Sequence, residues 1–173
     1  MIKLVLLYEQ IIKEVGDLEN ITPYEWNKIS KIKYNFLDKD GDKIYVDFQL
    51  YDKNDLESIE FSSNIPNPTK VYNVSYSLQG KQSQYKKDDY ISLIKIIKTV
   101  FDILKDFITN ESPSGITFFA GNKNEDFILS KTDPQKGRLY KTILLKNLSK
   151  FPGWSFTDTN LGDDFKGFIF YKK

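Results

Sequence analysis

The sequence predicts an α+β fold, a mixed and mostly antiparallel sheet of about six or seven strands with a long central helix packed on it. Two observations carry this prediction. Several short segments alternate apolar and polar side chains, which is the pattern of strands with one buried face. One long segment, residues 89–109, repeats apolar side chains at helical spacing, and its broad apolar face is typical of a helix that covers a sheet.

The expected elements follow in order from these patterns and from the turn signals between them. They are helices over residues 3–15 and 22–29, strands over residues 31–37, 44–50, 56–62 and 71–78, a helix over residues 89–109, a strand over residues 116–120, a helix over residues 137–150, and strands over residues 154–157 and 167–171. We expect a single α+β domain over residues 1–173, with N-terminal helices and a hairpin in residues 1–62 and the core half in residues 70–173.

Local signals justify the boundaries. Gly16 is expected to end the first helix, and Thr22 to start the second, because the proline that follows it suits the first helical position. Residues 38–42, rich in aspartate and containing a glycine, are expected to join the two hairpin strands. Asp88 or Asp89 is a natural N-cap for the long helix.

The chain lacks the side chains on which most catalysis at neutral pH depends. It contains no histidine and no cysteine, and Arg138 is its only arginine. The usual acid–base group and the thiol nucleophile are therefore missing, and zinc sites built on histidine and cysteine are excluded. We predict no catalytic residue, no metal site and no cofactor.

The charge balance argues against two classes of partner. Twenty-five basic and 24 acidic residues leave a net charge of +1, which gives no overall field toward nucleic acid or an anionic membrane. Residues 1–16 predict no signal peptide, and no later segment is apolar over the length of a membrane span. We therefore expect neither a membrane nor a nucleic acid as partner, and no secretion through a signal peptide.

Two segments have the outline of ligand-binding loops, and both have a simpler explanation. Asp38, Asp40 and Asp42 resemble the start of a calcium loop, but the sixth and twelfth positions hold lysine and glutamine instead of glycine and glutamate. A hairpin turn accounts for them. Residues 79–84 lie between a strand and the long helix, where phosphate loops occur, but they lack the second glycine and the Lys-Ser/Thr pair.

The element order from residue 71 onward is strand, polar connection, long helix, short apolar strand, helix, strand, strand. This order resembles the Gcn5-related N-acetyltransferase (GNAT) fold, in which residues 71–78 would be the central strand before the pyrophosphate loop and residues 116–120 the strand that diverges from it. The family's Arg/Gln-x-x-Gly-x-Gly/Ala motif is absent from residues 79–89, so no cofactor residue is carried over. The resemblance also places Tyr140 where the family often has a tyrosine acid, although its spacing suits the core as well.

A second resemblance covers about residues 95–145. It is carried by Thr99-Val-Phe, Ile103 and Phe107, by Pro113 and Ile116-Thr-Phe-Phe, and by Gly137-Arg138-Leu-Tyr140. These segments look like small, uncharacterised bacteriophage proteins with a GNAT-like fold. In that pattern Arg138 and Tyr140 stand close together at the start of a helix, and we single them out as candidate interaction residues.

The leading hypothesis is a phage-encoded, non-enzymatic protein that acts through protein–protein contacts. Its partner would be a phage structural protein or a host protein, and its location the virion or the host cytoplasm. The alternative is an acyl-CoA-dependent N-acyltransferase-like enzyme with a degenerate cofactor loop, in which Tyr140 and a carboxylate or an ordered water supply acid and base. A nucleic-acid-associated protein is a third hypothesis, although the lysines of the long helix alternate with aspartates on its polar side.

Overall fold

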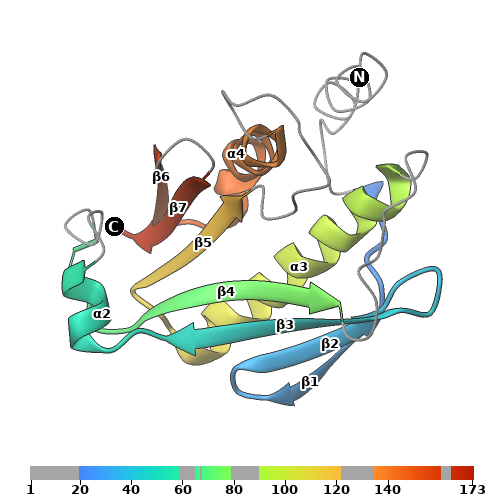
Figure 1. The fold of residues 1–173 in the computed structure, drawn as a ribbon, viewed down its shortest axis with the longest axis horizontal. Coiled ribbons are helices and arrows are strands. Elements are labelled where there is room, and N and C mark those ends of the chain that lie inside the picture. The colour runs from blue at the N-terminus through green and yellow to red at the C-terminus, as the bar shows by residue number, and fades with distance from the viewer. Residues whose placement is uncertain (1–19, 59–64, 67, 79–89, 122–134, 161–164) are drawn as a thin grey trace. The chain divides into compact units, whose positions relative to one another are not determined.

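The computed structural model describes residues 20–58, 65–66, 68–78, 90–121, 135–160 and 165–173 (Figure 1). The chain divides into two compact units, each made from two separate stretches of sequence. Unit 1 combines Met1–Gln49 with Val74–Ser112, and unit 2 combines Leu50–Asn73 with Pro113–Lys173. The single domain expected over residues 1–173 stays a prediction, and the helix expected over residues 3–15 lies outside the described part of the chain.

The strands confirm the expected mixed sheet. Within the described residues, seven strands are hydrogen-bonded in the order β1-β2-β3-β4-β5-β7-β6. Their bounds are Trp26–Ser30 for β1, Lys33–Leu37 for β2, Lys43–Leu50 for β3, Val71–Leu78 for β4, Gly115–Gly121 for β5, Trp154–Asn160 for β6 and Phe165–Lys172 for β7. β4 and β5 pair in parallel, whereas β1 with β2, β2 with β3, β5 with β7 and β6 with β7 pair antiparallel. The succession β4, α3, β5, α4, β6, β7 is the element order expected from residue 71 onward.

In unit 1, the expected hairpin is confirmed as β2 and β3. Alternate side chains are buried on one face of these strands, namely Tyr34, Phe36, Ile44, Val46 and Phe48. In the turn, the Asp38 carboxylate accepts hydrogen bonds from the backbone N–H groups of Asp40 and Asp42, at 2.9 and 2.8 Å. Gly41 has a φ of 79°, which a glycine adopts without strain. The aspartate that suggested calcium therefore holds the backbone of the turn.

Helix α3, Tyr90–Glu111, covers the buried face of this hairpin. The rings of Phe48 and Phe107 are stacked, with centroids 3.7 Å apart and planes 4° from parallel. Farther along the helix, the fully buried Thr99 hydroxyl accepts the backbone N–H of Tyr24 at 2.9 Å while donating to the carbonyl of Lys95. The long helix expected from the apolar stripe is confirmed, and it packs on the sheet of unit 1.

The helix expected over residues 22–29 is wrong, because Trp26–Ser30 form β1. Trp26 pairs with Phe36 and Lys28 with Tyr34. Lys28 interrupts the apolar–polar alternation in the sequence, because this exposed residue reaches Asp106 on α3 with its ammonium group. Pairing with β2 overrides the local helix-start signal.

The strand expected over residues 56–62 is also wrong in its described part. Residues Lys53–Ser58 form the short helix α2, and residues 59–62 lie outside the described structure. Asp52 and Asp55 cap the helix reciprocally: Asp55 N–H donates to the Asp52 carboxylate at 2.8 Å, and Asp52 N–H donates to the Asp55 carboxylate at 3.3 Å. This is a capping box with aspartate in place of glutamate.

In unit 2, aromatic side chains form a ladder across β5, β7 and β6. Phe168 of β7 stacks with Phe118 of β5 at 4.8 Å and with Phe156 of β6 at 5.7 Å. Phe170 stacks with Trp154 at 4.7 Å. The start of β5 is closely packed as well, because a Cβ atom added to Gly115 would lie 2.9 Å from the Ile65 side chain. Trp154 is also buried in the core of unit 2.

The expected second helix is confirmed as α4, Gln135–Asn147, followed by a single 3₁₀ turn, η3, Leu148–Lys150. Helix α4 contacts β5 and β6 within unit 2. None of the helices in the described ranges is both long and apolar enough to cross a membrane.

We predict that Phe107→Ala destabilises the protein by about 3–5 kcal/mol, because it removes a fully buried ring and leaves a cavity beneath Phe48. Urea unfolding of the whole chain, followed by circular dichroism, measures the loss. Thr109→Ala on the exposed part of the same helix is the matched control and should change the free energy of unfolding by less than about 0.5 kcal/mol. Equal effects of the two substitutions would contradict the assigned packing of α3.

Candidate functional site

The candidate interaction residues Arg138 and Tyr140 both lie in α4. They stand in its first half, as expected for the start of the second helix, and their side chains are outside the described structure. The described second half of α4 shows how the helix is held. Ile143, Leu144 and Asn147 are buried, and the Asn147 amide donates to the carbonyl of Ile143 at 2.8 Å.

The opposite side of the same turn of α4 is exposed. Leu145 has 53% of its surface accessible, and Lys146 beside it is exposed. Lys141 forms an ion pair with Asp158 of β6 at 2.9 Å, which ties the helix to the edge of the unit 2 strands. The helix therefore has one face fixed in the core and one that bears an apolar side chain in solvent.

The segment from α4 to η3 is also distinctly basic. Its charged residues are Lys136, Arg138, Lys141, Lys146 and Lys150, and residues 135–150 contain no aspartate or glutamate. Lysines near a helix C-terminus interact favourably with the helix dipole, which accounts for Lys146. The other basic residues concentrate positive charge on one element of a chain whose net charge is only +1.

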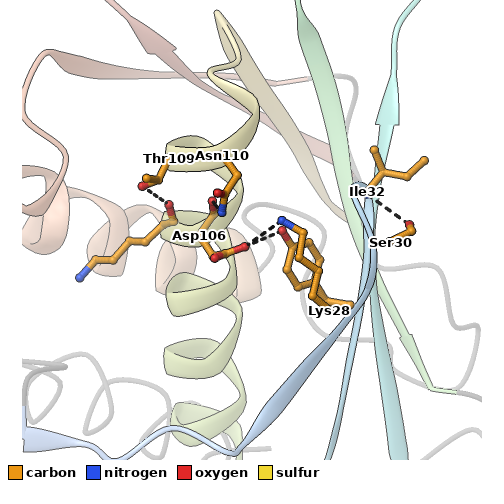
Figure 2. Close-up of polar contacts among 8 residues, drawn as sticks. Lys28, Ser30, Ile32, Asp106, Thr109 and Asn110 are labelled. Carbon is orange, nitrogen blue, oxygen red and sulfur yellow. Dashed lines mark hydrogen bonds and ion pairs between the residues drawn. The ribbon is translucent and has the colours of Figure 1, made fainter.

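Outside α4, a polar cluster in unit 1 joins the hairpin to α3 (Figure 2). The hydroxyl of Tyr34 donates to the Asp106 carboxylate at 2.8 Å, and the Lys28 ammonium reaches the same oxygen at 3.2 Å. Lys28 also lies 5.3 Å from the centroid of the Tyr34 ring. Tyr34 itself has no accessible surface. Asp106 thus provides a partner on α3 for the polar groups of Lys28 and Tyr34.

The electrostatics of this cluster favour a structural role. Burial is the main reason why the pKa of Tyr34 rises to about 12, and the neighbouring Asp106 carboxylate adds to the effect. Hydrogen bonding to Tyr34 and to Asp106 raises the pKa of Lys28. Tyr34 therefore stays protonated and Lys28 stays charged at neutral pH. Since the Tyr34 hydroxyl is buried and already donates to Asp106, it is not available to a substrate.

A second set of linked side-chain hydrogen bonds lies in unit 2. The Tyr51 hydroxyl and the Thr117 hydroxyl are 2.9 Å apart, and Thr117 donates to the Asn73 side-chain oxygen at 3.4 Å. Thr117 is buried on β5, and burial raises the pKa of Tyr51. These contacts satisfy polar groups beside the parallel β4–β5 pair, which is a structural task. Sequence reasoning missed these contacts because their partners are 66 and 44 residues apart in the sequence.

Other ligand-binding hypotheses find little support in the described residues. No group of three or more acidic side chains in the described ranges is arranged to hold a metal ion. On the polar side of α3, Lys98 is paired with Asp102 at 2.6 Å, and Lys95 lies over the Tyr24 ring at 4.4 Å. These two lysines are engaged within unit 1. The loop at residues 79–84 is outside the described structure.

We predict that Tyr34→Phe destabilises the protein by about 1–2 kcal/mol at neutral pH, because Asp106 loses a buried donor. The folded-state pKa of about 12 lies above the ordinary value of 10.0. The contribution of the protonated hydroxyl is thus complete below pH 10 and is lost as the pH rises toward 12. Unfolding free energies measured from neutral to alkaline pH should show a smaller alkaline loss for Tyr34→Phe than for the unaltered chain. If Tyr45→Phe, on the same hairpin, gives the same change, the assignment to Tyr34 is wrong.

Comparison with known proteins assigns no family. No family model and no curated protein matches the chain. A solved structure that does match is NAA60 of Arabidopsis thaliana in complex with a bisubstrate analogue, with 12% sequence identity and a TM-score of 0.34 over 99% of this chain and 94% of that one. At this distance the likeness says nothing about a reaction or a ligand of this chain.

Proposed function

We propose that the chain is a phage-encoded protein that acts through protein–protein contacts and catalyses no reaction, either as a virion component or as a binder of a host factor. Helix α4 is the contact element in this proposal. The observation that carries it is the exposure of Leu145, 53% accessible, on a helix whose Ile143, Leu144 and Asn147 are buried in unit 2.

The surroundings of Leu145 define the kind of contact. A single exposed leucine is ordinary on a protein surface. Here it follows Lys136 and Arg138 in a segment without acidic residues, so a partner can combine an apolar contact with an ion pair. Arg138 precedes Leu145 by seven residues, about two helical turns, which is the spacing of one helix face. Arginine also binds carboxylates with two parallel hydrogen bonds, which lysine cannot do.

A photo-crosslinking amino acid placed at Leu145 tests this proposal in the cells in which the protein is naturally made. We expect one discrete protein adduct, because the side chain would lie against the partner. Leu37, also 53% exposed but in unit 1, is the matched control position and should give no such adduct. Arg138→Ala should abolish the adduct at Leu145 while the melting temperature stays within about 2 °C. Identical adducts at the two positions, or none at Leu145, would overturn the assignment.

The second candidate function is acyl-CoA binding, with Tyr140 and a carboxylate or an ordered water as acid and base. It is favoured by the β4–α3–β5 succession, in which α3 connects two strands that pair in parallel. Fold alone does not imply an activity. Isothermal titration with acetyl-CoA distinguishes the two candidates: we expect no heat of binding, whereas a dissociation constant in the micromolar range would favour the acyltransferase. Coenzyme A without the acetyl group serves as the reference ligand.

A further inference from the structure

The connection between β1 and β2 exposes two isoleucines. β1 and β2 also form a hairpin, and we call its connecting end, residues Lys28–Lys33, the hairpin tip. Ile29 is 51% accessible and Ile32 46% accessible, although isoleucine is among the residues most often buried. The pairing register shifts between Lys28 and Ser30, so that Ile29 lies in a β-bulge. Figure 2 shows Ile32 and Ser30 on the side of the strands away from Asp106.

The hairpin tip is basic as well as apolar. It contains three lysines, and residues 26–37 contain no acidic residue. Two of these lysines have partners on unit 1, since Lys28 pairs with Asp106 and Lys33 pairs with Asp47, at 3.2 Å in each case. Lys31, between the two isoleucines, is exposed and makes no ion pair within the described ranges. A ligand at the tip would therefore meet apolar surface next to an uncompensated positive charge.

The backbone of β1 adds a third feature. β1 is the end strand of the sheet order, so among the described strands only β2 pairs with it. The other edge of such a strand presents N–H and C=O groups to whatever lies beside it. An extended peptide can pair with these groups and place alternate side chains against the edge.

The charge of the hairpin tip and the open backbone groups of β1 favour one of three possible ligands: a second copy of the chain, a lipid surface or a peptide. A second copy of the chain would bring the lysines of two tips together, and like charges at facing positions are destabilising. A lipid surface could accept the isoleucines but would leave the strand's backbone groups without partners. A peptide with carboxylate and apolar side chains satisfies the edge, the isoleucines and Lys31 at once.

We propose that the hairpin tip binds an extended acidic segment of another protein, which adds as a strand beside β1. Apolar β-branched side chains of this segment, such as valine, would contact Ile29 and Ile32, and a carboxylate would pair with Lys31. This surface belongs to unit 1, whereas α4 belongs to unit 2, so the inference stands or falls separately from the contact proposed for α4.

The test uses the full chain labelled with nitrogen-15 and a short synthetic peptide of alternating glutamate and valine. We expect the peptide to shift the amide resonances of Trp26–Ser30 more than those of β3, and added salt to weaken the binding. A peptide with lysine in place of glutamate, vesicles containing phosphatidylserine and a single-stranded RNA complete the comparison. Tighter binding of any of these three, or no shift in β1 with the acidic peptide, would overturn the proposal.

Variants locate the contact. Lys31→Glu should weaken the acidic peptide about three- to fivefold, the effect of one exposed ion pair. Replacing Ile29 and Ile32 together by serine should abolish the amide shifts. Leu37→Ser, at the other end of β2 and equally exposed, is the matched control and should bind like the unaltered chain. Circular dichroism should show all variants folded, because every substituted side chain is about half exposed or more. If Leu37→Ser loses as much binding as the isoleucine variant, the peptide does not bind at the hairpin tip.

Discussion

The packing of α3 on the hairpin of unit 1 is the constraint on which this half of the chain depends. Stacked Phe48 and Phe107 lie at one part of the contact, and the buried Thr99 hydroxyl with its bond from Tyr24 lies at another. Between a strand and a helix that are otherwise apolar, polar groups must find partners inside the contact. Asp106 supplies them by accepting from Tyr34 and Lys28, so the helix can cover β1 as well as β2 and β3.

In unit 2, the packing between strands depends on aromatic rings. Its strands β5, β7 and β6 are held by stacked side chains, and α4 covers them through Ile143 and Leu144. Because these inward residues fix the helix, its outward residues are free to differ in composition. Apart from the Lys141–Asp158 ion pair, the side of α4 that bears Leu145 faces solvent, which makes it a better place to seek a binding function than the buried tyrosine networks.

The sequence predicts those elements whose periodicity is uninterrupted. The stripe of α3 and the alternation of β2 and β3 place buried residues at regular intervals, and β5 is a mostly apolar run; each of these elements is confirmed. β1 was missed because Lys28 interrupts its apolar pattern, and the partner of Lys28, Asp106, is 78 residues away in the sequence. α2 was missed because its start depends on a reciprocal bond between two aspartates. Both failures come from polar side chains whose partners are set by the folded structure.

The candidate site was less accessible to sequence reasoning than the fold. Arg138 and Tyr140 fall in a helix as expected, but their role stays a prediction. Neither the exposure of Leu145 nor that of Ile29 and Ile32 follows from periodicity, since isoleucine and leucine usually indicate core positions. A bulge in β1 and the contacts of α4 with β5 and β6 decide which apolar residues face solvent. Such details arise from tertiary packing and leave no local pattern.

The way each unit is assembled from two separate stretches has a consequence for synthesis on the ribosome. Unit 1 has all its residues once Ser112 has emerged, whereas unit 2 already contains Leu50–Asn73 and must wait for the C-terminal strands. The beginning of β4 consequently spends an interval without its neighbour β5. A nascent chain paused in that interval would display an open parallel edge, and an unpaired strand edge invites aggregation or the binding of chaperones.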